Sequence, residues 1–316
     1  MTLELRSVIG TVMEPIFERE FSRRSYGFRP GRSAKDALRE VDRELKNGGR
    51  YVAEADWKAY FDTIPHEKLM ERVRERVADG RALDLVEAFL KQGVMEGERV
   101  EASEAGTPQG GVISPLLANI YLNPLDHSME QKGYAMYRYA DDLVIISRTR
   151  AEAEGALNEL RAWTETAGLT LHPEKTRIVD MNEAGAGFDF LGYHFERTRR
   201  GKLGRWPRQK SLGKLRDTIR HYTHRANGKS LDEIITRINA VSRGWYEYFK
   251  HSNRITFVGM DGWIRQRLRS ILRKRQGRRG RARGLDQRRW PNAFFAQHGL
   301  FSMCEAHILA CQSVHR

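Results

Sequence analysis

Residues 138 to 142 read Arg-Tyr-Ala-Asp-Asp, and an apolar run from Leu143 to Ile146 follows at once. The pattern predicts a β-hairpin with two adjacent carboxylates at its tip. Like charges this close repel each other, so each carboxylate tends to hold a proton or to recruit a cation. A divalent metal site is the economical explanation of such a pair.

A third acid, Asp56, directly follows another segment of alternating apolar residues, Tyr51 to Ala55. Three carboxylates can hold two metal ions for the transfer of a nucleotidyl group. Two ions about 3.5–4 Å apart clamp the attacking and the leaving oxygen of an in-line displacement. The residues therefore predict phosphoryl-transfer chemistry at Asp56, Asp141 and Asp142.

The net charge of +14 is distributed unevenly along the 316 residues. Residues 1–198 contain 27 Lys and Arg against 34 Asp and Glu, whereas residues 199–316 contain 28 against 7. All the excess positive charge lies in the last third, which indicates a nucleic-acid-binding module joined to a mildly acidic part. A basic surface that serves solubility alone is the alternative, because charge bias by itself is a weak signal.

Neither end of the chain nor its longest uncharged stretch predicts a membrane segment. The first ten residues lack the apolar core of a signal peptide. The uncharged stretch from Ala105 to Leu125 contains three prolines and three glycines, which disfavours a membrane helix. Two cysteines are too few for a disulfide scaffold. We therefore expect a soluble cytoplasmic protein without a membrane partner.

Cys304, His307, Cys311 and His315 suggest a zinc site at first sight. If residues 302–315 form a helix, the outer two lie about 16 Å apart along its axis. Four ligands on one helix cannot converge on one tetrahedral ion. We expect packed cysteines and surface histidines, and a pair such as His307 and Cys311 serving a site completed elsewhere is the alternative.

Hydrophobic periodicity predicts the secondary structure. We expect strands at 51–57, 177–181 and 188–195, hairpins at 94–101 and 135–147, and helices at 3–21, 66–77, 82–91, 114–129, 151–167, 210–223, 231–249 and 256–274, with a further helix from Ser33 to the glycines at 48 and 49. Ser33 and Asp36 form a weak capping pair. The order suits an antiparallel sheet with helices on one face, which is an α+β fold. The Arg/Gly-rich segment 276–284 reads as a flexible basic connector.

Seven sequence blocks resemble those of group II intron-type reverse transcriptases, also called maturases. They are Ser-Tyr-Gly-Phe-Arg-Pro-Gly-Arg-Ser at 25–33, Ala-Asp-Trp-Lys-Ala-Tyr-Phe-Asp at 55–62, Gly-Thr-Pro-Gln-Gly-Gly-Val-Ile-Ser-Pro-Leu-Leu-Ala-Asn-Ile-Tyr-Leu at 106–122, Arg-Tyr-Ala-Asp-Asp at 138–142, Gly-Leu-Thr-Leu-His-Pro-Glu-Lys-Thr at 168–176, Phe-Asp-Phe-Leu-Gly-Tyr at 188–193 and Arg-Gly-Trp-Tyr-Glu-Tyr-Phe at 243–249. They occur in the family's order and cover nearly the whole chain. The resemblance implies the right-hand palm of a polymerase, followed by an α-helical thumb and maturase domain.

The resemblance also divides the chain into four parts. Residues 1–50 would form partial fingers, residues 51–198 the palm with the catalytic carboxylates, residues 199–275 the helical basic thumb and maturase domain X, and residues 276–316 a basic linker with the C-terminal maturase tail. Family members carry an upstream fingers segment with basic residues that grip the triphosphate, and this sequence begins part-way through the helix that follows it. We therefore expect incomplete closure of the fingers over template and nucleotide.

In the family, the three aspartates are the catalytic residues. The resemblance implies that Asp56, Asp141 and Asp142, with the backbone carbonyl of Trp57, bind two Mg²⁺ ions, Mn²⁺ being the alternative metal. One ion would lower the pKa of the primer 3′-hydroxyl, and the other would hold the triphosphate and the leaving pyrophosphate. Asp62 and Asp126 are nearby acids that we do not assign to metal, and we expect Asp62 to cap the end of a strand.

Three residues match the family's nucleotide-binding positions. Phe61 would be the steric gate that favours deoxynucleotides, with a core phenylalanine as the alternative. Gln109 lies in a Gly/Pro loop that lets backbone approach a ligand closely, and it would contact the incoming nucleotide. Lys175 would neutralise or protonate pyrophosphate, with an exposed lysine of no special role as the alternative.

Two further sets of residues match nucleic-acid contacts of the family. Phe190, Leu191 and Gly192 resemble the primer grip, although their strand also suits ordinary sheet packing. Aromatic and cationic residues interleaved in the basic third suit stacked bases and phosphates. We expect Trp245 and Phe249 to pack a helix bundle, and we assign RNA or duplex contacts to Arg243, Lys250, Arg265, Arg269, Arg273, Arg278 and Arg279.

The sequence supports two functional hypotheses. The first is an RNA-directed DNA polymerase that uses an RNA template, a DNA primer and deoxynucleoside triphosphates, and that also binds intron RNA as a maturase in splicing and mobility. The second is a polymerase-impaired copy that acts only as an RNA-binding splicing or folding factor. The sequence does not identify the RNA or the oligomeric state.

Overall fold

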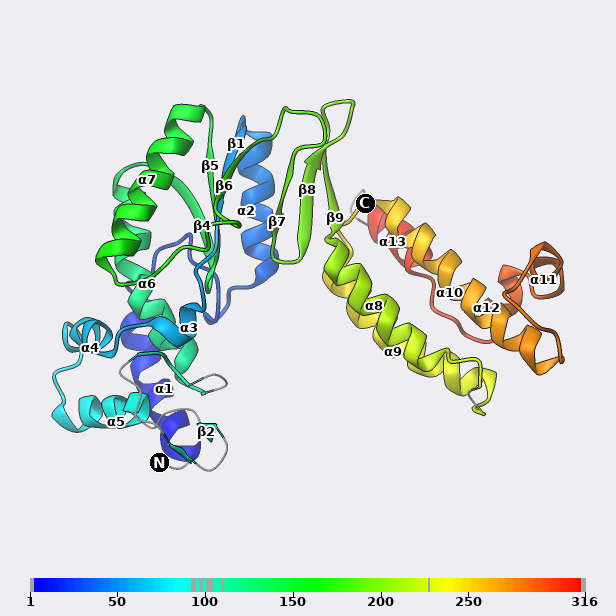
Figure 1. Ribbon diagram of the computed structural model, residues 1–316, viewed down its shortest axis with the longest axis horizontal. Coiled ribbons are helices and arrows are strands. Elements are labelled where there is room, and N and C mark those ends of the chain that lie inside the picture. Colours follow the sequence, from blue (N-terminus) through cyan, green and yellow to red (C-terminus); the bar gives the residue numbers. More distant parts are fainter. Residues whose placement is uncertain are drawn as a thin grey trace. The chain divides into compact units, whose positions relative to one another are not determined.

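The computed structural model describes residues 3–91, 95–96, 99–100, 105–108, 111–226 and 228–313 of the chain. It separates into two compact units (Figure 1). Unit 1 contains residues 1–191 and 197–203, and unit 2 contains residues 192–196 and 204–316. The finer division into fingers, palm, thumb and tail stays a prediction.

Unit 1 is built around a four-stranded antiparallel sheet in the order β4-β5-β1-β6 (Figure 1). Its strands are β1 (Tyr51–Ala55), β4 (Ala135–Tyr139), β5 (Asp142–Ser147) and β6 (Arg177–Asp180). β4 and β5 form the predicted hairpin, and Tyr139 pairs with Asp142 across a two-residue tip. The α+β palm predicted from the sequence is thereby confirmed.

Helices cover both faces of this sheet. Every residue of β5 from Leu143 to Ser147 is buried, although side chains of a strand alternate between two faces. α6 (Ser114–Gln131) and α7 (Arg150–Thr166) pack on one face, and α2 (Ala34–Lys46) lies on the other (Figure 1). The helices predicted on one face are present. The sequence also predicted the helix α2, but not that it would cover the second face of the sheet.

Further elements of unit 1 precede α6 in the chain. They are α1 (Leu3–Glu18), α3 (Tyr60–Thr63), α4 (His66–Arg74), α5 (Gly80–Lys91) and the short strands β2 (Met95–Glu96) and β3 (Arg99–Val100). Of these, α1 and α4 each pack with α5 and with α6. The capping pair that opens α2 is confirmed, because the backbone N–H and the hydroxyl of Ser33 both donate to Asp36, at 3.0 and 2.6 Å. The Ser33 hydroxyl holds the pKa of Asp36 below its usual value.

The strand predicted at 188–195 is two strands, β7 (Gly187–Phe190) and β8 (Tyr193–Arg197). The chain turns between β7 and β8 at Leu191 and Gly192, which both have positive φ, at 49° and 79°. With β9 (Leu203–Pro207), which the sequence did not predict, these strands form a sheet in the order β7-β8-β9. Apolar residues continue across the turn, so hydrophobic periodicity alone does not show it.

Unit 2 contains three long helices, α8 (Gln209–Tyr222), α9 (Leu231–Phe249) and α10 (Arg254–Arg275), and three shorter ones, α11 (Gly284–Arg289), α12 (Asn292–Gln297) and α13 (Met303–Ser313). Their shared core includes Ile238, Phe257, Ile264 and Phe295. The rings of Trp245 and Phe249 lie 4.7 Å apart, which confirms the predicted packing role of this pair. Among the described residues, no helix combines the length and the apolar character needed to cross a bilayer.

Candidate active site

Strand register places Asp56 and Asp142 at the same end of neighbouring strands. Ala55 pairs with Leu143 in the antiparallel ladder of β1 and β5. Asp56 follows Ala55 and Asp142 precedes Leu143, so the two acids leave the ladder side by side, with Asp141 in the hairpin tip. The two carboxylate-bearing segments, far apart in sequence, therefore meet as predicted.

Asp141 is half-buried and feels the charge of Asp56. Burial raises the pKa of the Asp141 carboxyl, and the Asp56 carboxylate raises it further. Its own backbone N–H, Arg138 and Lys175 oppose the shift. Burial and the neighbouring charge both make ionisation of this carboxylate costly. A bound cation would lower that cost, because its positive charge attracts both carboxylates.

Asp142 makes a different contact. One of its carboxylate oxygens accepts a hydrogen bond from the backbone N–H of Leu191, at 3.1 Å. Leu191 has positive φ and follows Phe190, which is 1% exposed. In this structure, Asp142 therefore fixes the backbone of the segment that the sequence predicts as primer grip.

The segment after Asp56 pairs with the block at 168–176. The backbone carbonyl of Asp56 accepts from His172 N–H at 2.7 Å, and Trp57 forms an isolated antiparallel bridge with Leu171. This pairing brings the ammonium of Lys175 to 2.6 Å from the Asp56 carboxylate. The structure thus brings together Asp56 and Lys175, residues that the sequence assigned to metal and pyrophosphate.

The acids suit a hard divalent cation in donor type, because Mg²⁺ takes oxygen ligands. In the described part of the chain, no three His, Cys, Asp or Glu side chains are grouped closely enough to hold a metal ion. Mg²⁺ usually keeps several waters and is bound by one or two carboxylates plus substrate phosphates. The pair of Asp56 and Asp141 fits that mode, in which nucleotide oxygens complete the coordination.

Arg138, just before the acidic pair, is fully buried and holds the hairpin tip. Its guanidinium donates from Nε to Oδ1 of Asp126, at 2.8 Å, and from Nη2 to Oδ2 of the same carboxylate. Its Nη1 donates to the carbonyl of Ala140 at 2.8 Å. It also donates to Asn119 and to the hydroxyl of Ser25, each at 2.9 Å. Burial disfavours the charged guanidinium, but Asp126 outweighs this effect and the pKa of Arg138 is raised.

The block at 25–33 packs against the same hairpin. A Cβ added to Gly27 would lie 2.2 Å from the backbone nitrogen of Ala140. Asn119 donates to the Gly27 carbonyl at 2.7 Å, and Tyr26 N–H donates to the carbonyl of Arg138 at 2.9 Å. The sequence indicated this block only by family resemblance, whereas the structure gives it a physical role beneath the acidic tip.

Phe61 anchors the start of the Gly/Pro loop. The backbone carbonyl of Phe61 accepts from Thr107 N–H at 2.6 Å, and its half-buried ring lies 5.4 Å from the ring of Tyr60. Gly106 has φ of 92°, and a Cβ there would lie 2.9 Å from the backbone of Asp62. Gln109 lies outside the described residues, so its predicted contact stays a prediction.

The two acids that were not assigned to metal have other environments. Asp126 is 4% exposed and pairs with Arg138. Asp62 is exposed and lies within α3, whereas β1 already ends at Ala55. The expectation that Asp62 caps a strand end is therefore wrong, because a short helix occupies this segment.

The residues of unit 2 that were predicted to contact nucleic acid differ in their burial. Arg269 is 5% exposed and donates to the carbonyl of Trp290 and to Asn292, and Arg273 donates to the buried Asp286. Those that reach the surface at least in part and do not bridge to a buried acid are Arg243, Lys250, Arg265, Arg278 and Arg279, whereas Arg273 is partly exposed but is held by Asp286.

Four other arginines form a cluster that the sequence analysis missed. Arg220 and Arg267 lie over the ring of Trp263, with their Cζ atoms 5.8 and 5.7 Å from its centroid. Arg267 donates to the hydroxyl and the carbonyl of Thr223, at 2.8 and 3.0 Å. Burial lowers its pKa, and Arg220, Arg225 and Arg281 lower it further. We call Arg220, Arg225, Arg267 and Arg281 the arginine cluster.

The cysteines and histidines near the C-terminal end do not form a zinc site within the described residues. Both cysteines are free, and Cys311 Sγ lies 3.7 Å from Nε2 of His307. The other ring nitrogen of His307 lies 3.0 Å from the carbonyl of Lys250. His315 lies outside the described residues.

Residues 4–195 match the model of the reverse transcriptase (RNA-dependent DNA polymerase) family. The chain belongs to this family. Residues 212–290 match the group II intron maturase-specific domain, which covers α8 to α11. The resemblance inferred from the seven blocks is confirmed. Reverse transcriptases generally use divalent metal ions, in keeping with the carboxylate pair of this member.

Two curated relatives of this reverse transcriptase family member illustrate the match. Protein YkfC of Escherichia coli K12 is 36% identical over 226 residues, which is 59% of this chain and 58% of that protein. The group II intron-encoded protein LtrA of Lactococcus lactis is 40% identical over 122 residues, 39% of this chain and 20% of LtrA. The chain therefore spans less than two thirds of these relatives. Among solved structures, apo telomerase from Candida tropicalis has a TM-score of 0.48 at 12% identity, covering 86% of this chain and 53% of that one.

Proposed function

We propose that this protein is an RNA-directed DNA polymerase of the group II intron type that also binds intron RNA as a maturase in splicing and mobility. The observation that carries the proposal is the meeting of Asp56 and Asp141 at one end of the β1-β5 ladder, inside a reverse transcriptase domain. The substrates would be deoxynucleoside triphosphates and a DNA primer on an RNA template. The proposal includes a cytoplasmic location, as expected from the sequence.

Asp56 and Asp141 would hold the divalent cations, Mg²⁺ or Mn²⁺, with the Trp57 carbonyl as a further ligand. Bound cations would neutralise triphosphate charge and lower the pKa of the primer hydroxyl. Asp142 would be a further metal ligand, as the family resemblance implies, and one of its carboxylate oxygens also holds the Leu191 backbone by accepting that N–H.

Lys175 would move between two anions. It pairs with Asp56 here and is 58% exposed, so it can turn toward a triphosphate without a large desolvation cost. The half-buried ring of Phe61 would act as the steric gate, Gln109 would contact the nucleotide, and Phe190, Leu191 and Gly192 would support the primer. These roles follow the family resemblance.

Primer extension on an RNA template with deoxynucleotides and Mg²⁺ tests the polymerase proposal. We expect extension by the parent protein and a loss of at least about 100-fold in Asp141→Asn, because the substitution removes a charge that preorganises the site. Asp62→Asn is the matched control, since it removes an exposed carboxylate six residues after Asp56. Undiminished extension by Asp141→Asn would refute the assignment of the site.

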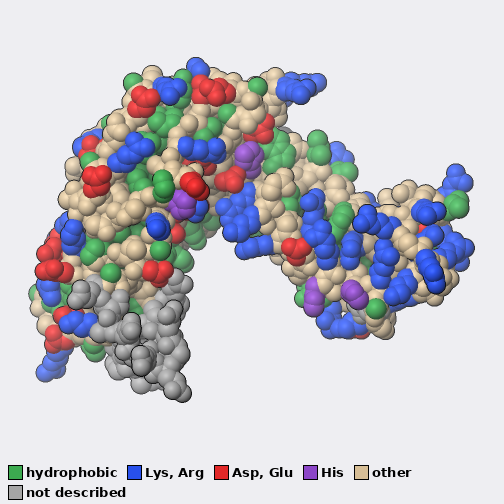
Figure 2. Space-filling model, viewed as in Figure 1, with side chains coloured by type: hydrophobic (Ala, Val, Ile, Leu, Met, Phe, Trp, Pro, Cys, Tyr) green, Lys and Arg blue, Asp and Glu red, His purple; other side chains and the backbone are tan. Residues whose placement is uncertain are grey.

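The arginine cluster supports RNA binding as the second activity. Like charges repel, so four guanidiniums in one neighbourhood favour a polyanion that neutralises them. Figure 2 shows Lys and Arg side chains gathered on unit 2, with few acidic ones in view. Two guanidiniums lie within 6 Å of the centroid of the Trp263 ring, and aromatic and cationic groups together suit nucleobases as well as phosphates.

Filter binding of a structured RNA at several salt concentrations tests this activity. In the double variant Arg220→Met/Arg267→Met we expect weaker binding and a salt slope that is smaller by about 1 to 2, because each neutralised phosphate contributes a slope of roughly 0.7 to 0.9. The double variant Arg72→Met/Arg74→Met in unit 1, whose arginines pair with Glu75 and Glu87, is the control with the same change of charge. An unchanged slope in the double variant would remove the cluster from the RNA-binding surface.

The two assays also distinguish the alternative of an RNA-binding factor without polymerase activity. That alternative predicts salt-sensitive RNA binding and no extension, even with the parent protein. It further predicts that Asp141→Asn leaves RNA affinity unchanged. Extension by the parent protein that Asp141→Asn abolishes would exclude it.

A further inference from the structure

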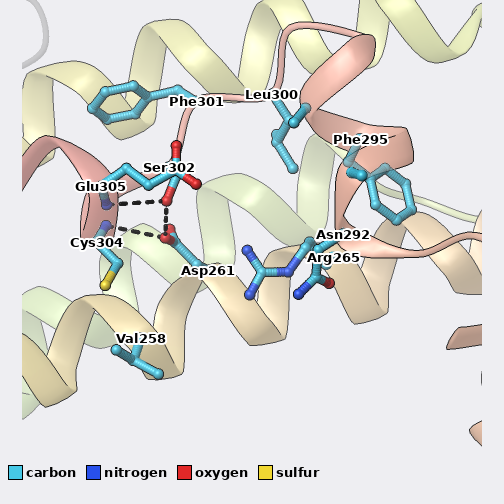
Figure 3. A pocket seen from close by; sticks show the side chains of 12 residues that line it. Val258, Asp261, Arg265, Asn292, Phe295, Leu300, Phe301, Ser302, Cys304 and Glu305 are labelled. Carbon is cyan, nitrogen blue, oxygen red and sulfur yellow. Dashed lines mark hydrogen bonds between the residues drawn. The ribbon is translucent and has the colours of Figure 1, made fainter.

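A pocket of about 290 Å³ opens between α10, α12 and the beginning of α13 in unit 2 (Figure 3). It mixes apolar walls with several polar side chains, which is the usual composition of a ligand-binding pocket. The lining side chains are those of Val258, Asp261, Arg265, Asn292, Ala293, Phe295, Ala296, Leu300, Phe301, Ser302, Cys304 and Glu305.

One side of the pocket is fixed by Asp261, which is 3% exposed. Its carboxylate accepts from the hydroxyl of Ser302 at 2.8 Å and from the backbone N–H groups of Met303 and Cys304 at 3.2 and 3.1 Å. These N–H groups open α13, so a buried charge on α10 caps that helix. Asp261 is fully engaged by the fold, and the pocket has a rigid frame.

Arg265 lies one turn beyond Asp261 on α10, and its side chain lines the pocket together with that of Asn292 (Figure 3). No hydrogen bond or ion pair to Arg265 is formed by any residue that the structure describes. The Asn292 side-chain oxygen already accepts from Arg269 at 2.8 Å, so its amide NH₂ is the group left to serve a ligand. The polar side of the pocket therefore offers donors.

Aromatic side chains and a hydrogen-bond acceptor also line the pocket. Phe301 supplies a partly exposed ring, with the Cζ atom of Arg243 4.4 Å from its centroid, whereas Phe295 is fully buried and closes the pocket wall. Glu305, exposed in the first turn of α13, supplies the acceptor of the lining set. A planar ligand with acceptors on one edge and donors on another would match both.

We propose that this pocket receives an unstacked guanine of single-stranded RNA. The O6 and N7 atoms of guanine are the acceptors that arginine pairs with most often, and its N1–H and NH₂ groups are donors suited to the carboxylate of Glu305. Arg243, beside Phe301, would meet the phosphate of the same nucleotide. The inference rests on the RNA binding proposed above and adds the base that is recognised.

RNA is favoured over other ligands by the charge of the surroundings. Residues 199–316 contain 28 Lys and Arg against 7 Asp and Glu, which attracts polyanions. Sequence-specific RNA recognition usually takes unpaired bases that are splayed out and stacked on aromatic or guanidinium planes. The pocket offers Arg265, Phe301 and apolar walls in that arrangement.

Fluorescence anisotropy with labelled 12-nucleotide RNAs tests the proposal on the full chain. The probes are oligouridine and three versions with one central guanine, adenine or cytosine. We expect the guanine probe to bind about 5- to 100-fold more tightly than oligouridine, the range of one good bidentate contact. In Arg265→Met this ratio should fall to within about twofold, and the loss of a positive charge should also weaken the binding of all four probes by a common factor.

A second variant keeps the proposal testable if Arg265→Met unfolds. Ala296→Phe fills the pocket without a change of charge and should also abolish the preference, whereas Gln297→Phe adds the same bulk at the next, non-lining position and should keep it. Equal affinity of the parent protein for the four probes, or a guanine preference that survives both pocket variants, overturns the proposal. Failure to bind oligouridine at all would instead count against the proposed RNA binding.

Discussion

The guanidinium of Arg138 donates a hydrogen bond to the backbone carbonyl of Ala140, 2.8 Å away, and so ties a buried cation to the residue directly before Asp141. Ala140 has φ of 57°, a conformation that non-glycine residues adopt rarely. The buried contacts of Arg138 with Asp126, Asn119 and Ser25 over-determine its position. The hairpin tip that carries Asp141 is thus held by a side chain of the strand that leads into it.

Breaking this buried pair should cost both stability and activity. In Arg138→Met, Asp126 becomes an uncompensated buried charge, and we expect a loss of about 3–5 kcal/mol in the free energy of unfolding. Urea denaturation measures this loss. The double variant Arg138→Met/Asp126→Leu should recover much of the stability but not primer extension, because the hydrogen bond to Ala140 stays absent. Full recovery of extension would show that Arg138 does not position the tip.

Gly27→Ala should impair extension more than stability. The new Cβ would lie 2.2 Å from the Ala140 nitrogen and 2.8 Å from the Tyr139 carbonyl carbon, both backbone atoms that cannot rotate away. Overpacking of this kind costs about 1–3 kcal/mol, and a displacement of 1 Å at a catalytic group can cost about 100-fold in rate. Steady-state extension and thermal melting measure the two effects.

Gly213→Ala is the control for this change. Gly213 lies within α8, and nothing lies within 4 Å of a Cβ added there. Alanine should stabilise that helix by about 0.5–1 kcal/mol and leave extension intact. Equal activity in the two variants would mean that the hairpin tip accommodates the methyl group.

The meeting of Asp56 with the acidic hairpin could be predicted because both lie at the ends of apolar segments, where strands of one sheet end. The role of Arg138 could not be predicted, since its partner Ser25 lies 113 positions away in the sequence. An arginine close to two acids in sequence also suggests an exposed side chain, not a buried one. The arginine cluster was missed for the same reason, because Arg220 and Arg267 come together only through the packing of α8 and α10 around Trp263.

Burial also explains why one basic residue, Arg269, is a poor candidate for RNA contact. Arg269 lies on α10 in a run of arginines at positions 265, 267, 269 and 273 that looks uniform in sequence. Within the helix, however, Arg269 faces the core beside Phe295, with its Cζ atom 5.2 Å from the ring centroid. Residues two positions apart on a helix face different sides, so Arg269 is buried whereas Arg267 is only partly buried.

Lys175→Met should raise the affinity of the site for a divalent cation. The lysine ammonium lies 2.6 Å from an oxygen of Asp56, where it competes with a metal ion for the same carboxylate. The pair is exposed and worth at most about 1 kcal/mol, so we expect an increase in Mn²⁺ affinity of up to about fivefold. Electron paramagnetic resonance of free Mn²⁺ measures it. Lys91→Met, which removes an exposed lysine paired with Glu87, should leave the affinity unchanged.

Stability at acid pH should depend on Asp180, which ends β6 and pairs with Tyr51 of β1 in the sheet that carries the site. Hydrogen bonds from the Arg50 guanidinium, with Nε at 2.9 Å and Nη2 at 2.6 Å, lower the pKa of Asp180 from 3.8 to about 2. Because the folded-state pKa is the lower one, the ionised carboxylate stabilises the fold above about pH 4, and this contribution is lost as the pH falls toward 2. Urea midpoints of Asp180→Asn should therefore lie below those of the parent at pH 5 and converge with them near pH 2. Arg50→Met should give the same convergence, since it removes the cause of the shift, and a difference that stays constant from pH 5 to pH 2 would contradict the assignment.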